Sequence, residues 1–379
     1  MTIEYDVAIV GLGAMGSAAA AFLAARGARV LGIETHFPAH ALSSSHGDSR
    51  LIRLGYFEDP SYVPLLQRAY QNWRAWEAAL RTDLLFVAGV LQIGKADSKI
   101  VSGTEASCKL HGLPYERLDK TETERRFPAF KLDEGEVAVL DPQGGYLKPE
   151  AAVMGALKIA AAHGAELHFG ERVTALEPDA RGVSIVSSTA RYRARKIIVA
   201  TGAWVADLVP ALRPYAMPIR QVVAWYQPQD GFVAQVGRMP CFLRDEGNGG
   251  SYFGFPALGA DGVKIGRHAH FMEPIDPEKP NPPVNEKDRA LLDDFAVRRL
   301  LGVASHRVRE TTCRYTMLPS EDFLIDFLPG HDNVVISSAC SGHGFKFMSV
   351  VGEILADLAL IGETQLPRSL FSFHRHFGA

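Results

Sequence analysis

The N-terminal segment joins a short apolar run, a glycine-rich turn, a helical stretch and a second apolar run that ends in an acid. The first run covers residues 5–10, the turn contains Gly11, Gly13 and Gly16, and Glu34 closes the second run. The first glycine permits a tight turn, the second lets the backbone approach a pyrophosphate, and the third lets helix and strand pack closely. The helix N-terminus favours phosphates, and the acid can accept hydrogen bonds from ribose hydroxyls. This pattern predicts an adenine dinucleotide site, without saying which dinucleotide.

Composition narrows the class of protein. A chain of 379 residues that is 47% hydrophobic and 22% charged can bury a large core, and we expect two lobes. Its formal net charge of −3 gives no reason to expect nucleic acid or an anionic membrane as a partner. We find no apolar stretch of the ~20 residues that span a bilayer and no signal peptide, so we expect a cytoplasmic protein. The four cysteines have neither CxxC nor zinc spacing, so no metal site is predicted.

The middle of the chain favours FAD over a nicotinamide cofactor. A helix is expected over residues 150–163, and strands are expected over residues 166–169, 172–177, 183–186, 191–193 and 196–200. A helix, a small β-meander and a return strand suit an FAD-binding domain. Gly202 follows the return strand and would let the chain pass close under the cofactor, although a strand that simply ends where a helix begins stays possible.

The C-terminal region repeats this arrangement. A strand over residues 333–337 precedes a turn with Gly342, His343 and Gly344, and a helix is expected over residues 345–360. Three glycine turns at the ends of strands could converge on one elongated ligand. In a flavoprotein, the positive end of this last helix would stabilise the anion of the reduced ring.

We therefore predict an α/β chain with two lobes (α+β in arrangement). A Rossmann-like FAD-binding domain with a β-meander is assigned to residues 1–60, 146–215 and 311–379. An antiparallel-sheet substrate-binding domain is assigned to residues 61–145 and 216–310. The second domain is expected to contain helices over residues 62–80 and 286–301 and strands over residues 220–226, 250–255 and 263–268.

Four further stretches make a family resemblance specific: residues 45–53, 264–268, 313–317 and 341–347. In this order on a dinucleotide-binding chain, they resemble the monomeric sarcosine oxidase and N-methyl-L-tryptophan oxidase family over essentially the full length. The resemblance implies covalent FAD and oxidation of the secondary amines of N-methyl or cyclic amino acids. It also implies molecular oxygen as acceptor, hydrogen peroxide as product and a monomeric protein.

The resemblance assigns the flavin attachment to Cys313, which matches the cysteine that forms a thioether to the flavin 8α-methyl carbon. A thiolate is a soft nucleophile, so this chemistry is sensible. We expect the neighbouring Arg309 and Arg314 to lower the pKa of this thiol. Cys340 is interpreted as a packing residue.

The resemblance also implies a substrate site. Arg53 and Lys346 match a pair of cations that hold an amino-acid carboxylate, through a guanidinium fork and a point charge. Lys264 matches a lysine beside flavin N5 that promotes the reaction with oxygen, because a fixed positive charge stabilises the negative charge that develops there. His268 matches a pocket histidine that either helps keep the amine neutral or only forms a hydrogen bond.

Other matching positions flank the flavin or the substrate. His46, Arg50 and His343 match flavin-flanking positions, and we expect His46 and Arg50 to tune the ring electrostatically rather than to transfer protons.

Tyr315 retains a family tyrosine, but Phe253 stands where the sarcosine enzyme has a pocket tyrosine, with Tyr252 expected on the opposite face of the strand. The lost hydroxyl makes the pocket more apolar and favours a larger or more hydrophobic substrate side chain.

Three alternatives remain open at this point. An FAD-dependent dehydrogenase would pass electrons to a protein or quinone and form no peroxide, but Lys264 argues against it. A non-catalytic flavin-binding redox sensor or assembly subunit would need no carboxylate clamp, and no amine would bleach its flavin. A plain NAD-dependent dehydrogenase would be colourless.

Overall fold

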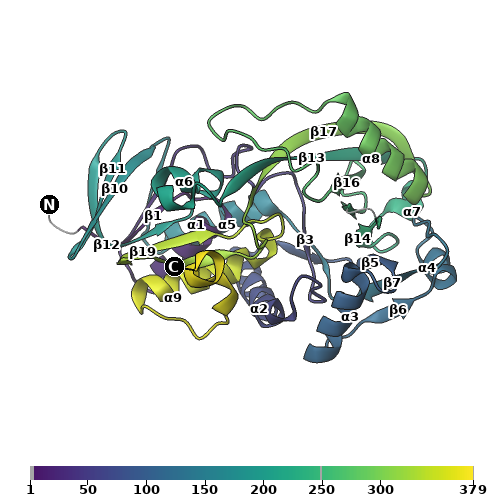
Figure 1. Cartoon of the computed structure of the whole chain (residues 1–379), viewed down its shortest axis with the longest axis horizontal. Coiled ribbons are helices and arrows are strands. Elements are labelled where there is room, and N and C mark those ends of the chain that lie inside the picture. Colours follow the sequence, from purple (N-terminus) through teal and green to yellow (C-terminus); the bar gives the residue numbers. More distant parts are fainter. Residues whose placement is uncertain (1–3, 248–249, 379) are drawn as a thin grey trace.

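The computed structural model describes residues 4–247 and 250–378. Its two eight-stranded sheets lie at opposite ends of an elongated molecule, with β3 of a small three-stranded sheet between them (Figure 1). The strands of the small sheet are β3 (Arg50–Ile52), β4 (Leu85–Val87) and β8 (Gly145–Leu147).

The first large sheet is the Rossmann-like one. Its strands are β1 (Tyr5–Val10), β2 (Val30–Glu34), β9 (Glu166–Phe169), β10 (Val173–Asp179), β11 (Gly182–Ser187), β12 (Arg191–Val199), β18 (Leu324–Leu328) and β19 (His331–Ser338). The order β9–β2–β1–β12–β19 is parallel throughout, β18 lies antiparallel beside β19, and the β10–β11 hairpin extends from the start of β12. The carboxyl ends of the parallel strands therefore meet at one edge, where open α/β sheets bind their ligands.

Helices cover one face of this sheet. They are α1 (Ala14–Ala25), α2 (Val63–Leu80), α5 (Pro149–Ala162) and α9 (Met348–Leu360). Val7 and Ile9 of β1 pack with these helices, whereas Ala8 and Val10 pack on the other face, because successive side chains of a strand alternate. The other face is covered by the β10–β11 hairpin, α6 (Val205–Leu208), η3 (Pro210–Leu212) and α10 (Phe373–Phe377).

The second large sheet has the order β17–β13–β16–β15–β14–β5–β7–β6. Its strands are β5 (Val90–Lys95), β6 (Glu116–Leu118), β7 (Glu136–Asp141), β13 (Met217–Pro228), β14 (Cys241–Asp245), β15 (Ser251–Phe255), β16 (Val263–Arg267) and β17 (Val303–Met317). Every pair is antiparallel except β5 with β14. These two strands come from separate segments of the chain, so no hairpin turn forces them to run in opposite directions.

Helix α8 (Glu286–Arg299) packs on the outer face of the second sheet through Leu292, Phe295 and Ala296. The inner face is turned towards the first sheet. The remaining helical segments are α3 (Lys99–His111), α4 (Lys120–Arg126), α7 (Gly231–Ala234), η1 (Pro60–Tyr62), η2 (Gly202–Trp204), η4 (Phe345–Phe347) and η5 (Ser369–Phe371).

The predicted fold class is confirmed, with two differences in detail. Residues 191–193 and 196–200 were expected to be separate strands but mostly form the single strand β12. The first part of β12 pairs with β11 and the rest pairs with β1, so the strand continues without a break. Residues 166–169 form the far edge strand β9 rather than part of the meander. The domain boundaries stay a prediction, and β17 runs across the one drawn between residues 310 and 311.

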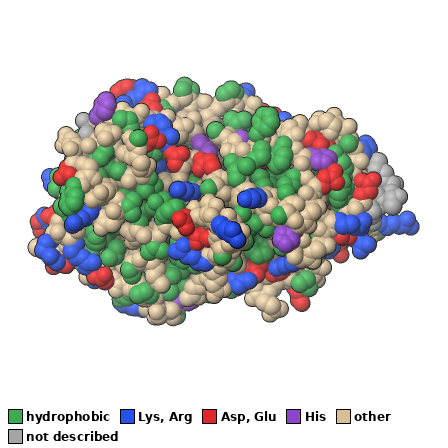
Figure 2. All heavy atoms as spheres, turned by 180° about the vertical axis from the view of Figure 1, so that it is seen from behind, with side chains coloured by type: hydrophobic (Ala, Val, Ile, Leu, Met, Phe, Trp, Pro, Cys, Tyr) green, Lys and Arg blue, Asp and Glu red, His purple; other side chains and the backbone are tan. Residues whose placement is uncertain are grey.

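The surface in Figure 2 mixes basic and acidic side chains with apolar ones, in keeping with the small formal net charge of −3. Within residues 4–247 and 250–378, no helix has both the length and the apolar character needed to cross a bilayer. The same residues contain no group of three His, Cys, Asp or Glu side chains placed to hold a metal ion.

Candidate cofactor and substrate site

A cavity of about 670 Å³ lies between the two large sheets. It begins at the carboxyl ends of β1, β2 and β12 and continues to the inner face of the second sheet. That face contributes Gln221, Val223, Leu243, Phe253 and Phe255, together with residues 313–316 near the end of β17. Its size is typical of a pocket for a cofactor or another small molecule.

The three glycines of the N-terminal turn have distinct surroundings. Gly11 has a φ of +88°, and a Cβ there would lie 2.6 Å from the carbonyl oxygen of Ala200, the residue after the neighbouring strand β12. A Cβ on Gly13 would meet nothing within 4 Å, and Gly13 lines the cavity. A Cβ on Gly16 would overlap the Gly11 carbonyl, so Gly16 permits the close packing of helix and strand and does not itself line the cavity.

Glu34 ends β2 at the cavity wall. Its Oε2 accepts a hydrogen bond from the Leu12 amide at 2.9 Å, and its Oε1 accepts one from the His36 amide at 3.0 Å. Helix α1 begins after Gly13 without a side-chain cap, so N–H groups of its first turn remain available to a ligand. Gly202, with a φ of +55°, lines the cavity after β12.

Buried polar atoms without a partner test whether these walls suit a dinucleotide. Within the described part of the chain, several such atoms belong to cavity-lining residues: His40 Nδ1, Arg53 Nε, Thr201 Oγ1, Gln221 Oε1, Thr316 Oγ1, Ser337 Oγ and Ser338 Oγ. Buried polar groups are nearly always hydrogen-bonded in folded proteins. Their distribution along the cavity therefore fits a long ligand with polar groups throughout, as FAD is.

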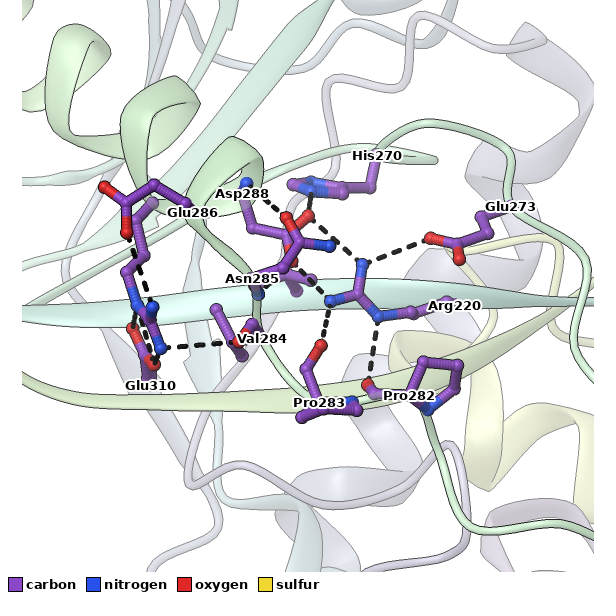
Figure 3. Close-up of polar contacts among 12 residues, drawn as sticks. Arg220, His270, Glu273, Pro282, Pro283, Val284, Asn285, Glu286, Asp288 and Glu310 are labelled. Carbon is purple, nitrogen blue, oxygen red and sulfur yellow. Dashed lines mark hydrogen bonds and ion pairs between the residues drawn. The ribbon is translucent and has the colours of Figure 1, made fainter.

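Two buried arginines hold a proline-rich segment against the dinucleotide end. Arg220 of β13 pairs in register with Arg314 of β17. Arg314 donates to the Pro277 carbonyl at 2.8 Å, and Arg220 donates to the carbonyls of Pro282 and Pro283 (Figure 3). Pro277 lines the cavity, so these arginines help to build its wall.

Cys313 is buried and lines the cavity. Burial raises the pKa of its thiol, and the nearby cations Arg50 and Lys264 oppose that effect. The prediction that Arg309 and Arg314 would supply this charge is wrong. Arg314 points to the opposite face of the strand, and Arg309 lies roughly 13 Å further along it and pairs with Asp48 and Asp261.

Lys264 lies behind the cavity wall rather than in it. Its Nζ donates to the carbonyls of Gly47 at 2.6 Å and Ser49 at 2.9 Å, and Arg50 donates to the same Ser49 carbonyl at 2.9 Å. Burial and the charge of Arg50 hold the pKa of Lys264 well below its usual range. His46 is also outside the lining, and burial together with Arg50 and Lys264 lowers its pKa to about 3, so this imidazole is neutral.

The predicted carboxylate clamp contains an acid that the sequence analysis missed. Arg53 Nη2 lies 2.6 and 2.7 Å from the two carboxylate oxygens of Glu58, whereas its buried Nε has no partner among the described residues. Burial opposes the ionisation of Glu58, but the cations Arg53 and Lys346 outweigh it and lower the pKa of Glu58 to about 2. Lys346 donates to the His343 carbonyl at 2.7 Å, and burial and Arg53 lower the pKa of Lys346 to about 7.

His268, Tyr315 and Gly342 meet at the same end. The two rings lie 5.7 Å apart between centroids, and a Cβ on Gly342 would lie 2.6 Å from both. Burial lowers the pKa of His268, and we find no hydrogen-bonding partner for either ring nitrogen in the described chain. A neutral imidazole therefore faces the cavity.

His343 has both ring nitrogens engaged. Its Nε2 donates to the Glu321 carbonyl at 2.9 Å, so its Nδ1 accepts from the Tyr56 hydroxyl at 2.6 Å. Burial lowers its pKa to about 3. Gly344 follows in a turn where a Cβ would overlap the Ala339 carbonyl. His343 therefore fixes the cavity wall in a neutral form.

Phe253 faces the cavity, whereas Tyr252 stacks on Phe295 beneath α8 with ring centroids 4.0 Å apart. The prediction that these neighbours lie on opposite faces is confirmed.

Among the predicted site residues, all but Gly16, His46 and Lys264 line the cavity. Glu58 lies five residues after Arg53, but nothing in the sequence marks it as the partner of that arginine. Gln221 lies opposite Cys313 in the pairing of β13 with β17. The two residues are 92 positions apart in the sequence, so no local pattern reveals that they meet.

Comparisons with known proteins agree with this geometry. The profile of the family described as FAD dependent oxidoreductase matches residues 6–358. The chain is 38% identical to monomeric sarcosine oxidase of Streptomyces avermitilis over 381 residues, covering 99% of this chain and 98% of the relative. It is 36% identical to N-methyl-L-tryptophan oxidase of Escherichia coli O157:H7 over 376 residues, covering 98% of this chain and all of the relative.

A solved structure is similar along its whole length. It is the open form of NikD, described as an unusual amino acid oxidase essential for nikkomycin biosynthesis. The two folds superpose with a TM-score of 0.84 at 28% identity, over 98% of each chain.

Proposed function

Because the chain belongs to the FAD dependent oxidoreductase family that includes monomeric sarcosine oxidase and N-methyl-L-tryptophan oxidase, we propose that it oxidises secondary-amine amino acids. The substrates are N-methylated or cyclic, the amine becomes an imine, and molecular oxygen is reduced to hydrogen peroxide. The bound flavin supplies the two-electron chemistry between the amine and oxygen.

The observation that carries this proposal is the pair of buried cations at the cavity. Arg53 has one buried donor, Nε, without a partner in the described chain, and Lys346 lies in the same wall. A guanidinium and an ammonium in a water-poor pocket suit a carboxylate. The adjoining walls contain Phe57, Phe253 and Phe255, which exclude water and favour an apolar substrate side chain.

The remaining residues prepare the amine and the oxygen step. Burial disfavours a charged ammonium, so the pocket favours the reactive neutral amine, and the neutral His268 can accept or donate one hydrogen bond to it. We assign to Lys264 and Arg50 the positive charge that stabilises negative charge as oxygen is reduced. His46, neutral and buried beside them, shapes this field without transferring protons.

We further propose that FAD is attached covalently to Cys313. This cysteine is buried at the cavity wall, and Arg50 and Lys264 favour its thiolate. Cys340 also lines the cavity, but its sulfur accepts a weak hydrogen bond from the Thr316 amide at 3.5 Å, and we assign it to packing. Cys313→Ser should release its flavin on denaturation, whereas the matched Cys340→Ser should retain it. Flavin retained by the Cys313 variant would place the attachment elsewhere.

The oxidase activity is tested by product stoichiometry. With an N-methyl or cyclic amino acid, oxygen consumption and peroxide formation should each equal the amine oxidised. The decarboxylated amine should react far more slowly, because it offers nothing to Arg53 and Lys346. Reduction of a dye without peroxide formation in air would instead identify a dehydrogenase.

A further inference from the structure

The loop that receives Lys264 contains an uncommon backbone turn. Gly47 has a φ of +99° and Asp48 has a φ of +68°, and the Ser49 amide donates to the Gly47 carbonyl at 2.8 Å. A γ-turn with positive φ at a residue other than glycine is rare and strained. Such strain persists only where surrounding contacts hold it.

This turn directs its acceptors at one ammonium group. The Gly47 and Ser49 carbonyls accept from Lys264 Nζ, and the Ser49 hydroxyl lies 3.3 Å from it. The rings of Trp225 and Phe255 lie 5.3 and 5.0 Å from the same nitrogen. The three donors of the ammonium are therefore matched by three acceptors, all from the turn.

A distant carboxylate holds the turn from the other side. Glu150 lies in the first turn of α5, and its Oε1 accepts from the Gly47 amide at 2.5 Å and from the Asp48 amide at 3.2 Å. The side chain of Asp48 pairs with Arg309, whose guanidinium carbon lies 3.7 Å from the centre of the Trp225 ring. One carboxylate oxygen thus fixes both residues that carry positive φ.

We propose that Glu150 is the positioning residue of Lys264, because its carboxylate holds the Gly47–Ser49 turn whose carbonyls retain and orient the ammonium group. This inference rests on the proposed role of Lys264 in the reaction with oxygen. Glu150 acts through the backbone and needs no contact with substrate or flavin.

The charged groups around Lys264 also connect Glu150 to this lysine. Arg50 of β3, Cys313 of β17, Asp48 of the turn and Glu150 of α5 face this lysine. Burial and Arg50 lower the pKa of Lys264, whereas Cys313, Asp48 and Glu150 raise it. Removal of the charge at residue 150 should therefore lower that pKa further, and the ammonium should lose its proton at a lower pH.

The test compares the two half-reactions of the holoenzyme by stopped-flow absorbance. Glu150→Ala should slow reoxidation of the reduced enzyme by oxygen about tenfold, the effect of one lost charge-assisted contact, and should change reduction by substrate less than about twofold. Glu150→Gln keeps an oxygen acceptor but not the charge. It should slow reoxidation less and shift the fall of the reoxidation rate to lower pH.

A matched control variant and a second measurement distinguish loss of the Lys264 position from general destabilisation of the protein. Glu286→Gln removes an acid from the first turn of α8, where the carboxylate contacts Arg289, and should leave both half-reactions unchanged. Hydrogen exchange at the amides of residues 47–49 should accelerate in Glu150→Ala and not in Glu150→Gln, because only the alanine variant loses the acceptor.

Lys264→Met distinguishes the two levels of the argument. It should slow reoxidation, and adding Glu150→Ala to it should have no further effect, because the two residues act as a unit. If Lys264→Met leaves reoxidation unchanged, the proposed role of Lys264 fails. If Lys264→Met slows reoxidation but Glu150→Ala does not, or if the Gln variant has an unshifted pH profile, the assignment of Glu150 alone is overturned.

Discussion

Arg220 and Arg53 are both buried and both pair with a carboxylate, but their surroundings differ. Arg220 donates through all three guanidinium nitrogens, to the carboxylate of Asp288 and to the carbonyls of Pro282 and Pro283 (Figure 3). Arg53 also pairs with an acid, but its buried Nε has no partner within residues 4–247 and 250–378.

The acids differ as well. Asp288 also accepts hydrogen bonds from His270 Nε2 at 2.8 Å and from the Asn285 amide at 2.8 Å, and it lies in the first turn of α8, outside the cavity lining. Glu58 lines the cavity and faces the cations Arg53 and Lys346. We call the Arg220–Asp288 pair saturated, because every guanidinium nitrogen of Arg220 has an acceptor, and the Arg53–Glu58 pair unsaturated, because Arg53 Nε has none among the described residues. A saturated pair stabilises the fold. An unsaturated pair beside a cavity can exchange partners with a ligand. The contrast separates structural from functional arginines where residue type does not.

The largest expected effect is on stability at the saturated pair. Arg220→Met should lower the free energy of unfolding by about 3–5 kcal/mol, because it leaves Asp288 buried without its main partner. Arg172→Met is the matched control, since it removes a bidentate pair with Glu278 in which both side chains are about half exposed, and it should change the free energy by less than about 1 kcal/mol. Urea unfolding measures both. Equal losses of stability in the two variants would show that the buried pair of Arg220 contributes no more than an exposed pair.

The next effect concerns binding at the unsaturated pair. Arg53→Lys keeps the positive charge but loses the planar fork, so the Kd for an amino-acid substrate should rise roughly 30-fold, about 2 kcal/mol. The free energy of unfolding should change much less than in Arg220→Met. Anaerobic flavin titration and urea unfolding of the same variant provide both values. An unchanged Kd together with a large loss of stability would make Arg53 a structural residue.

A pH effect of about tenfold follows from Lys346. Below a pKa of about 7 this ammonium is charged and attracts a carboxylate, and above that pKa it becomes neutral. The Kd of propionate, which has no amine to titrate, should therefore rise about tenfold between pH 6 and pH 8. Glu58, with a pKa of about 2, stays ionised over this range. Lys346→Met should flatten the dependence, and a Kd that falls as the pH rises would contradict it.

The smallest effect concerns the pocket wall. Phe253→Tyr adds a hydroxyl to a side chain that already lies against Gly266 and should change the Kd by less than about fivefold. N-methylglycine should gain affinity relative to N-methyltryptophan, because the added hydroxyl makes the pocket smaller and its wall more polar. A change in the opposite direction, measured by the same titration, would remove Phe253 from the account of specificity.

The two regions also differ in how far the sequence could predict them. Gly11, Gly13, Gly16 and Glu34 lie on one continuous strand–helix–strand segment, so their spacing alone carries the geometry. The period of two along a strand likewise places Tyr252 and Phe253 on opposite faces. The same rule would have shown that Arg314 points away from Cys313.

The rest depends on contacts between distant segments. Glu150 has the sequence context of an ordinary acid at a helix start, and its second role arises only because the turn at Gly47 packs against α5. Pro282 and Asp288, two partners of Arg220, come from the loop before α8 and from the first turn of α8, 62 and 68 residues further along the chain, and only the folded structure brings them together. Local pattern therefore predicts the dinucleotide end well and the charged partners of the substrate end poorly.

The most direct test is the anaerobic absorbance spectrum of the purified protein during titration with N-methylglycine, N-methyltryptophan, proline and pipecolate. We predict a flavin spectrum that at least one of these amino acids bleaches, with the colour restored on admission of oxygen. A flavin spectrum that none of them bleaches would contradict the proposed amine oxidation, while leaving the fold and its cavity as described.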